Sequence, residues 1–378
     1  MPEMANSPLR ILHAVRAPVG GIFRHILDLA VGQAERGHAV GILADSLTGG
    51  DRAEAALKEI APRLKLGVHR LAIRREPHPA DTTAAMQFLK IAQSLNLDVL
   101  HGHGAKAGVY VRLKGKSKNA IRVYTPHGGS LHYPPNTLKG ALYAKMERAL
   151  MDRTELFLFE SRFACDTYER VIGKPTKGLV RCVFNGVTAS EFDAVKPAED
   201  ATDLVYVGEF RAIKGTDLLI EAVGRLRSRG RSVTLTLAGD GEETEKLKAL
   251  IKKLKLEDVI RFIGHVKARF GFSKGQLLIV PSRGDSMPYV VIEAAAAGVP
   301  MLAANVGGIP EIFGPHTSGL FARNDAGAMA DAIETALADM SATHARAKEL
   351  RERIFMHFSQ NAMVDGVMNG YRDAFNSR

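Results

Sequence analysis

The segment PSRGDSMPYVVIEAAAAGVP, residues 281–300, places two carboxylates, Asp285 and Glu293, eight positions apart among mostly apolar residues. The chain is expected to leave a buried strand and enter a buried helix here, with Glu293 in the first helical turn. A carboxylate in that turn can be structural, because the helix dipole favours negative charge there. A buried carboxylate also needs polar partners, and the hydroxyl groups of a bound nucleotide sugar would supply them. The segment therefore predicts either a cap with a core acid or a pair of hydroxyl ligands.

Two cations occupy a second expected strand-to-helix loop, VGEFRAIKG, which contains Arg211 and Lys214. In such a loop they could neutralise a departing diphosphate, or they could be ordinary solvated charges. The sequence has no D-x-D pair of the kind that holds a divalent metal in many sugar-transfer enzymes. It also has no G-x-x-x-x-G-K-[ST] phosphate loop, and APVGGIF does not match G-x-G-x-x-G. We therefore expect a site that works without a metal or another cofactor.

Four histidines in the first half, His101, His103, His127 and His132, raise the question of a metal site. Only His101 and His103 are close in sequence, and no cysteine accompanies them, so we expect no metal there. His127 ends a predicted strand, which favours a polar role in a binding cleft over a structural one. For His101 and His103 a structural role explains the sequence equally well.

Strand and helix patterns alternate along the chain. Apolar runs that predict buried strands lie at 10–15, 38–44, 97–104, 120–129, 155–161, 203–210, 232–241, 259–266, 276–282 and 299–308. Amphipathic stretches at 21–37 and 214–230 predict helices. Nearly every expected strand is followed by glycine and polar residues, which let a ligand approach the backbone. This alternation predicts an α/β fold of doubly wound parallel sheets, in which ligands bind beyond the carboxyl ends of the strands.

The length of 378 residues exceeds the usual size of one domain and predicts two. The polar segment 189–203, with its proline and acidic residues, is the best candidate for a linker. We place the first domain at 1–192, the second at 193–360 and a separate C-terminal helix at 361–378.

Charge is divided unevenly between the two halves. Residues 1–190 carry 27 Lys and Arg against 16 Asp and Glu, a balance of +11, and residues 191–378 carry 24 against 25, a balance of −1, which together give the net +10. The basic half could face phosphates or lipid headgroups, or its cations could be solvated. Its dense basic run, 112–122, lacks interleaved aromatic residues, so nucleic acid is not an expected partner.

Targeting signals and cysteine pairing are not apparent in the sequence. Cys165 and Cys182 fit neither a disulfide framework nor a metal site. The first residues do not match a signal peptide, and no apolar run approaches the roughly 18–20 residues of a spanning helix. These features predict a reduced, soluble, cytoplasmic protein.

The motifs taken together resemble the retaining glycosyltransferases of family four, which have the two-domain GT-B fold. In the second half, VGEFRAIKGTDLLIEA, LAGDG, RFIGHV, PSRGDSMPYVVIEAAAAGVP and VGGIPEI follow that family's order and approximate spacing. In the first half, GGIFRHILDLAVGQAERGHAV, DVLHGHGAKAG, YTPHGG and FNGVTASEF resemble bacterial members that build exopolysaccharide or lipid-linked glycans. The resemblance covers nearly the whole chain. It implies two Rossmann-like domains facing a cleft, an N-terminal one for the acceptor and a C-terminal one for the nucleotide sugar, with the final helix packed on the first.

The resemblance also implies roles for individual residues. Glu293 matches the second acid of the E-x7-E motif, which accepts hydrogen bonds from ribose hydroxyls, and Asp285 stands where the first Glu lies, near the donor sugar. Lys214 matches the lysine that contacts the donor diphosphate, and His127 matches a histidine that hydrogen-bonds the transferred sugar. The other implied contacts with the donor are Gly20, Gly21, Gly239, His265, Val266, Gly307, Gly308 and Ile309.

Three positions depart from the family pattern. Asp285 is one methylene shorter than Glu, which changes its reach to the sugar. Pro288 replaces a usual glycine and removes a backbone donor. Glu209 stands where the family has an arginine, and Arg211, two positions later, could supply that charge. Each departure could change the choice of donor or the activity.

The function that the resemblance implies is metal-independent transfer of a hexosyl group with retention of anomeric configuration. The donor would be a UDP- or GDP-linked sugar and the acceptor a glycan or polyprenyl-linked sugar, in bacterial polysaccharide biosynthesis. The basic first half leaves open a peripheral contact with the anionic inner face of the membrane. The alternatives are an epimerase or phosphorylase of the same fold and a non-catalytic nucleotide-sugar-binding protein.

Overall fold

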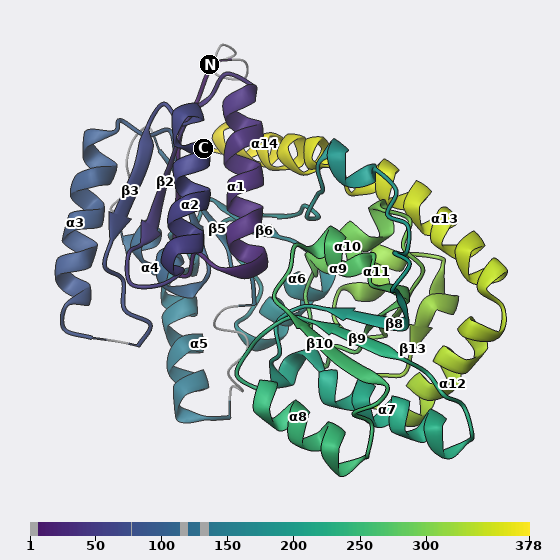
Figure 1. The fold of residues 1–378 in the computed structure, drawn as a ribbon. Helices are drawn as coiled ribbons and strands as arrows, with labels where there is room; N and C mark the ends of the chain where they lie inside the picture. The colour runs from purple at the N-terminus through teal and green to yellow at the C-terminus, as the bar shows by residue number, and fades with distance from the viewer. Residues whose placement is uncertain (1–6, 77, 114–119, 129–135) are drawn as a thin grey trace. The chain divides into compact units, whose positions relative to one another are not determined.

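The protein forms two compact units in a computed structural model that describes residues 7–76, 78–113, 120–128 and 136–378. Unit 1 comprises Met1–Asn185 together with Gln360–Arg378, and unit 2 comprises Gly186–Ser359 (Figure 1). The chain thus enters unit 2 before the border that the sequence suggested after residue 192. The segment 189–203 belongs to unit 2, where a short 3-10 helix, η4 (Ala189–Phe192), precedes the first strand.

In the described part of unit 1, seven parallel strands form one sheet in the order β3-β2-β1-β4-β5-β6-β7. The strands are β1 (Arg10–Val15), β2 (Ala39–Asp45), β3 (Gly67–Leu71), β4 (Val99–His103), β5 (Ile121–Thr125), β6 (Leu156–Phe159) and β7 (Leu179–Cys182). The sequence predicted the five central strands. It missed the edge strands β3 and β7, whose half-exposed residues give no continuous apolar run.

Helices cover both faces of this sheet, because successive residues of each strand point to opposite faces. Helices α1 (Gly20–Glu35), α2 (Gly50–Ile60) and α14 (Gln360–Asn376) pack on one face, and α3 (Asp81–Ser94), α4 (Ala105–Leu113), α5 (Leu138–Met151) and α6 (Arg162–Val171) pack on the other. Ile11 joins the apolar core under α1 and α14, while Leu12 joins the core under α3 and α4. His13, the next residue of β1, therefore faces α1 and α14.

Unit 2 repeats the architecture with six strands among its residues, all parallel, in the order β10-β9-β8-β11-β12-β13. They are β8 (Thr202–Val207), β9 (Leu235–Ala238), β10 (Ile260–Gly264), β11 (Gly275–Val280), β12 (Met301–Ala304) and the two-residue β13 (Leu320–Phe321). The helices are α7 (Thr216–Ser228), α8 (Thr244–Lys253), α9 (Ala268–Phe272), α10 (Tyr289–Ala296), α11 (Ile309–Phe313), α12 (Ala326–Ala338) and α13 (Met340–His357). The α/β, doubly wound parallel fold predicted from the sequence is confirmed in both units.

A buried ion pair joins two helices on the α4 face of unit 1. Arg112 on α4 lies 2.8 Å from Glu147 on α5, and their side chains are 0% and 4% exposed. The guanidinium also lies over the ring of Tyr124, 3.9 Å from its centroid, and the Tyr124 hydroxyl donates to Glu147 at 2.8 Å. The carboxylate thus balances one buried cation and accepts a hydrogen bond from one buried hydroxyl group.

Removing this carboxylate is expected to destabilise unit 1. The variant Glu147→Ala leaves Arg112 charged and unpaired in the core, which costs about 3–5 kcal/mol of unfolding free energy in comparable cases. Urea unfolding monitored by circular dichroism measures the loss. The matched control is Glu35→Ala, because the Glu35–Arg63 pair is about 60% exposed at both side chains and should matter little. Equal losses of unfolding free energy in the two variants would contradict a stabilising role of the buried Arg112–Glu147 pair.

Candidate functional site

The two central strands of unit 2 end in loops that an ion pair connects. In doubly wound sheets ligands bind where the order of the strands reverses, which in unit 2 is between β8 and β11. Lys214 follows β8 and Asp285 follows β11. The Lys214 Nζ donates to both carboxylate oxygens of Asp285, at 2.7 and 3.0 Å. The structure thus brings together two predicted site residues that are 71 positions apart.

The loop after β12 contacts the same aspartate through the backbone. The Gly308 N–H donates to the Asp285 carbonyl at 3.0 Å. Gly307 has φ +62°, and a Cβ built there would lie 1.7 Å from the Asp285 carbonyl oxygen. Only glycine permits this approach. Gly307 and Gly308 therefore lie beside Asp285, and the first residue of α11, Ile309, follows them.

A second ion pair, which the sequence analysis missed, fixes the same loops. Arg283 donates to both carboxylate oxygens of Asp217, at 2.7 and 2.6 Å, and to the Ala212 carbonyl. Asp217 lies in the first turn of α7, so this pair ties the loop after β11 to the helix that follows β8. The opposite charges within SRGDS and KGTD are apparent in the sequence, but no sequence pattern indicates that Arg283 forms an ion pair with Asp217.

Arg211 lies apart from the Lys214–Asp285 pair. Its side chain is 49% exposed and lies 3.8 Å from Glu209 and 4.0 Å from Glu242. Its charge therefore partly balances Glu209, the residue that departs from the family pattern, and no ion pair in the described chain joins it to Asp285.

The expectation that Glu293 lies in the first turn of a buried helix is wrong. Helix α10 begins at Tyr289 after Pro288, which places Glu293 in the second turn. Glu293 is also partly exposed, although Ile292 and Ala294 beside it are buried. A role as a cap at the helix start is thereby excluded.

Three further predicted residues follow β9 and β10 at the same edge of the sheet. Gly239 lies so close to Gly208 that an added Cβ would be 1.9 Å from the Gly208 carbonyl oxygen. His265 is exposed and Val266 is half-buried, and both follow the edge strand β10. His265 and Val266 are thus one strand farther from the β8–β11 pair than Gly239 and the loop after β12 are.

In unit 1 the predicted residues follow β1 and β5. Gly20 and Gly21 are exposed and begin α1, with Gly20 at φ +61°. His127 follows β5 and has φ +49°, a left-handed conformation that is uncommon for a residue with a side chain. His132 lies outside the described residues.

Five histidines meet at the carboxyl edge of the unit 1 sheet, under α1. His103 is the centre: its Nε2 is 3.0 Å from the Nδ1 of His13, and its Nδ1 is 3.0 Å from the Nε2 of His127. The ring centroids of His101 and His103 are 4.0 Å apart, with the ring planes tilted by 33°, and the ring centroid of His25 on α1 lies 5.1 Å from that of His127. The cluster brings together His101, His103 and His127, which the sequence analysis considered separately, and adds two residues, His13 and His25.

The cluster is neutral because it is buried. Burial lowers the pKa of His13 to about 4 and that of His127 to about 3. The pKa values of His25, His101 and His103 are also held well below 6.5 by burial and, secondly, by the other histidines. At neutral pH all five rings are uncharged hydrogen-bonding groups.

The sequence analysis did not identify His13 or His25, although each has a recognisable feature in the sequence. His13 is the polar residue inside the apolar strand RILHAV, and His25 and Gln33 are eight positions apart on one face of α1. The His25 Nδ1 donates to the Asn185 Oδ1, 3.0 Å away, and the Gln33 Oε1 accepts from the His13 Nε2. Neither contact follows from local spacing.

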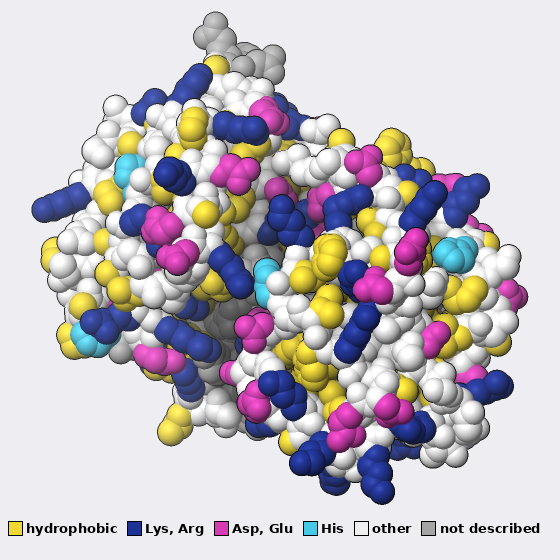
Figure 2. All heavy atoms as spheres, in the orientation of Figure 1, with side chains coloured by type: hydrophobic (Ala, Val, Ile, Leu, Met, Phe, Trp, Pro, Cys, Tyr) yellow, Lys and Arg dark blue, Asp and Glu magenta, His cyan; other side chains and the backbone are white. Residues whose placement is uncertain are grey.

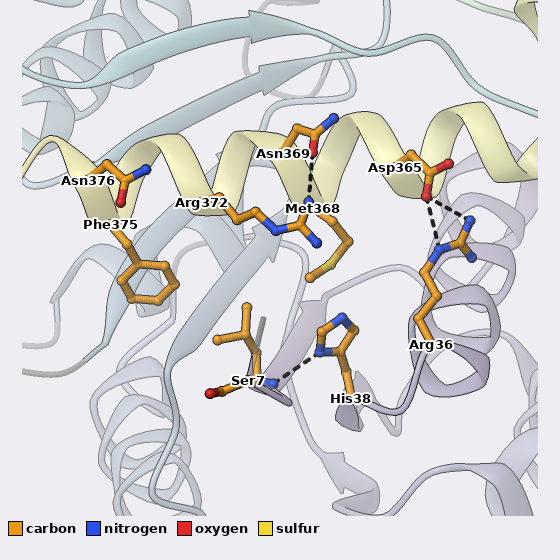
Figure 3. Close-up of a pocket in the computed structure, with 10 residues that line it drawn as sticks. Ser7, Arg36, His38, Asp365, Met368, Asn369, Arg372, Phe375 and Asn376 are labelled. Atoms are coloured by element: carbon orange, nitrogen blue, oxygen red, sulfur yellow. Dashed lines mark hydrogen bonds and ion pairs between the residues drawn. The ribbon is translucent and has the colours of Figure 1, made fainter. Parts of the chain in front are cut away.

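A hollow of about 420 Å³ in unit 1 lies away from this edge (Figure 3). Leu9 and His38, which line it, precede β1 and β2, so the hollow lies at the amino ends of the strands. Figure 3 shows Arg36 reaching Asp365 on α14, at 2.8 Å, and Arg372 beside Asn369. Its position is opposite to the edge where ligands of such sheets bind.

Two family models match consecutive parts of the chain. The model described as Glycosyltransferase Family 4 matches residues 19–191, and the model described as Glycosyl transferases group 1 matches residues 188–354. The chain belongs to the glycosyltransferases of family 4. The family that the motifs resembled is thereby confirmed.

Curated relatives and solved structures agree with this family. The glycogen synthase of Mycobacterium tuberculosis is 25% identical over 93% of this chain and 91% of its own length. The N-acetyl-alpha-D-glucosaminyl L-malate synthase of Bacillus anthracis is 25% identical over 90% of both chains. Anabaena HepE, solved with UDP-glucose, has a TM-score of 0.79 at 18% identity, covering 98% of this chain and all of its own. The structural match shows the GT-B fold.

No helix within the described ranges is long and apolar enough to span a bilayer.

Acid is expected to destabilise unit 1 through the buried histidines. Their folded pKa values are lower than the unfolded value of 6.5, so the unfolded chain binds more protons as the pH falls. The contribution of the neutral histidines to the free energy of unfolding is fully present above about pH 6.5 and is lost progressively as the pH falls toward 4. Thermal unfolding at pH 7.5, 6.5 and 5.5 should show a falling midpoint. His344→Gln, which removes an exposed histidine, should not change this dependence; a constant midpoint would contradict the neutral cluster.

Replacing Gly307 is expected to displace the loop beside Asp285. Gly307→Ala adds a Cβ that overlaps a backbone carbonyl, in addition to the strain of a left-handed alanine. The control is Gly298→Ala, which has a similar φ of +71° but whose nearest neighbour is the Arg351 side chain at 3.5 Å. We expect Gly307→Ala to lower the thermal midpoint of unit 2 by clearly more than the control does. Similar midpoints would show that the loop can relax.

Proposed function

We propose that this glycosyltransferase moves a hexosyl group from a UDP- or GDP-linked sugar to a hydroxyl group of a glycan or polyprenyl-linked acceptor. The configuration at the anomeric carbon is kept, and no metal or other cofactor takes part. The observation that carries the proposal is the Lys214–Asp285 ion pair, which spans the two loops at the strand-order reversal of unit 2.

This ion pair provides both groups that a nucleotide-sugar donor needs. The pair is partly exposed, with the Lys214 side chain 26% and the Asp285 side chain 15% accessible. We assign the ammonium to the donor diphosphate, where it would stabilise the charge of the leaving group. We assign Asp285 to the hydroxyls of the sugar and Glu293 to those of the ribose. The backbone of Gly307 to Ile309 adjoins Asp285 and suits contacts with the sugar and diphosphate.

Arg211, His265, Val266 and Gly239 complete the proposed donor contacts from the loops after β8, β9 and β10. Arg211 would add positive charge near the diphosphate once its side chain has moved away from that of Glu209. The complex of Anabaena HepE with UDP-glucose supports a UDP-linked sugar as the first donor to try.

Unit 1 is assigned to the sugar and the acceptor. His127 would accept or donate a hydrogen bond at the transferred sugar, and the exposed Gly20 and Gly21 leave room for phosphate or acceptor at the start of α1. The acceptor hydroxyl attacks the anomeric carbon from the side that the diphosphate leaves, and the leaving phosphate accepts its proton. No enzyme nucleophile is needed, and the side chains hold the reactants in place.

A role in bacterial polysaccharide biosynthesis at the inner face of the membrane is part of the proposal. Its support is the basic balance of residues 1–190. The face drawn in Figure 2 shows Lys and Arg side chains interspersed with Asp and Glu, so a membrane contact would use dispersed charges on that face.

Donor binding tests the proposal through two matched lysines. Lys214→Ala removes the proposed phosphate ligand, whereas Lys274→Ala removes an equivalent Lys–Asp pair with Asp200 at 2.8 and 3.0 Å. Lys274 precedes β11, at the opposite edge of the sheet. Calorimetry with UDP, GDP, ADP and their sugars should show micromolar binding to the wild type. Lys214→Ala should weaken it by about 1.5 kcal/mol or more, the scale of a hydrogen bond between charged groups, and Lys274→Ala should not.

Turnover assays then separate the possible functions. Transfer to an added acceptor, with the product's anomeric configuration read by NMR, supports the proposal. Interconversion of the sugar without an acceptor would indicate an epimerase, and tight binding without any turnover would indicate a sensor. Absence of nucleotide binding to the wild type would remove the donor assignment altogether.

A further inference from the structure

Three histidines of unit 1 form a hydrogen-bonded chain that runs from Gln33 on α1 to His127. The Gln33 Oε1 lies 2.8 Å from the Nε2 of His13. The other nitrogen of His13 lies 3.0 Å from the Nε2 of His103, and the other nitrogen of His103 lies 3.0 Å from the Nε2 of His127. Gln33, His13 and His103 are at most 1% exposed, so water does not compete for these bonds.

The chain has a direction because a neutral imidazole carries one N–H and one lone pair. Burial keeps the rings neutral, as their lowered pKa values indicate. The Gln33 Oε1 can only accept, so the proton of His13 is on Nε2 and its Nδ1 accepts from His103. The proton of His103 is then on Nε2, and its Nδ1 accepts from His127. One amide oxygen thus fixes the tautomers of three rings.

The last ring of the chain is the one assigned to the substrate. With its proton on Nε2, His127 has its lone pair on Nδ1. This Nδ1 has no hydrogen-bond partner among residues 7–76, 78–113, 120–128 and 136–378. His127 is also less buried than the other members of the chain. Its left-handed backbone, φ +49°, holds the ring at the end of β5.

We propose that Gln33, acting through His13 and His103, sets the tautomer of His127 so that its Nδ1 accepts a hydrogen bond from a hydroxyl of the transferred sugar. This inference rests on the proposed function for the identity of the ligand. Gln33, His13 and His103 are then positioning residues, and they discriminate in favour of a ligand that donates a hydrogen bond at this position.

The neighbours of the chain hold the rings without adding a charge. The nitrogens of His101 contact the Tyr371 hydroxyl on α14 and the Thr125 hydroxyl on β5, both at 2.8 Å. The His25 Nδ1 contacts Asn185 at 3.0 Å. These groups are all uncharged at neutral pH, so they do not favour protonation of the chain.

Metal binding is the rival explanation, because His13, His101 and His103, or His25, His103 and His127, lie close enough to hold an ion. A tetrahedral zinc site places neighbouring nitrogens about 3.4 Å apart with their lone pairs converging. Here both nitrogens of His13 and both of His101 already have hydrogen-bond partners, and the nitrogen pairs of the chain are 3.0 Å apart. The geometry favours hydrogen bonds between the rings.

NMR of the full chain with ¹⁵N-labelled histidine tests the tautomers without any donor. In the wild type at pH 7.5, long-range ¹H–¹⁵N spectra should show His127 protonated on Nε2 and unprotonated on Nδ1. Gln33→Met, which keeps the length but loses the acceptor, should give a mixture of tautomers at His127. Gln360→Met is the control, since Gln360 lies in unit 1 and its amide donates to the Asp28 carbonyl rather than to a histidine.

Several results would overturn the proposal. They are a His127 proton on Nδ1 in the wild type, an unchanged tautomer in folded Gln33→Met, and stoichiometric zinc in the purified protein by elemental analysis. The wild-type spectrum decides the question even if Gln33→Met fails to fold.

Kinetics then test the link to the substrate separately. Gln33→Met should lower kcat/KM for the nucleotide sugar about tenfold, as expected for the loss of one hydrogen bond, while the affinity for the nucleoside diphosphate alone stays constant. If the tautomer shifts but kcat/KM does not, the chain exists and the assignment of His127 to the sugar is wrong. If no donor binds to any form, the proposed function fails while the tautomer result stands.

Discussion

The parallel pairing of the first strand of each unit with the fourth is the constraint on which both candidate sites depend. β8 pairs with β11, and β1 pairs with β4, so the chain leaves neighbouring strands toward opposite sides of the sheet. The loops after such strands diverge and leave space at the carboxyl edge. In unit 2 that space holds Lys214 and Asp285. In unit 1 the same geometry places His13 opposite His101 in the strand register.

The carboxyl edges of the two sheets differ in the kind of polar groups that they carry. Unit 2 presents charges that are partly solvated and already paired with each other, Lys214 and Asp285; in the proposed function Lys214 would bind the donor diphosphate. Unit 1 buries neutral rings and satisfies them with one another, with Gln33 and with hydroxyl groups. A buried polar network is stable only when nearly every member is satisfied. One edge therefore suits the neutralisation of charge, and the other suits the recognition of hydroxyl groups.

Close backbone packing maintains the unit 2 edge. Gly239 and Gly307 each lie within contact of a carbonyl oxygen of a neighbouring loop, where a side chain would not fit. The Arg283–Asp217 pair adds a second connection between the loops after β8 and β11. These contacts hold Lys214 and Asp285 in position, which matters because electrostatic stabilisation requires groups that are oriented before the reaction.

The alternation of strands and helices, the parallel fold of both units and the family could all be predicted from the sequence. Apolar runs and glycine turns are local signals, and the central strands, buried on both faces, display them strongly. The edge strands β3, β7 and β13 were missed because they are short or half-exposed.

Which side chains come into contact could not be predicted from the sequence and became apparent from the folded structure. The pairing of Lys214 with Asp285 spans 71 positions, and the contact of His13 with His103 spans 90. It also placed Glu293 in the second turn of α10, because the helix begins only after Pro288. Strand order brings such residues together, and strand order is set by the packing of the whole sheet, which no local pattern encodes.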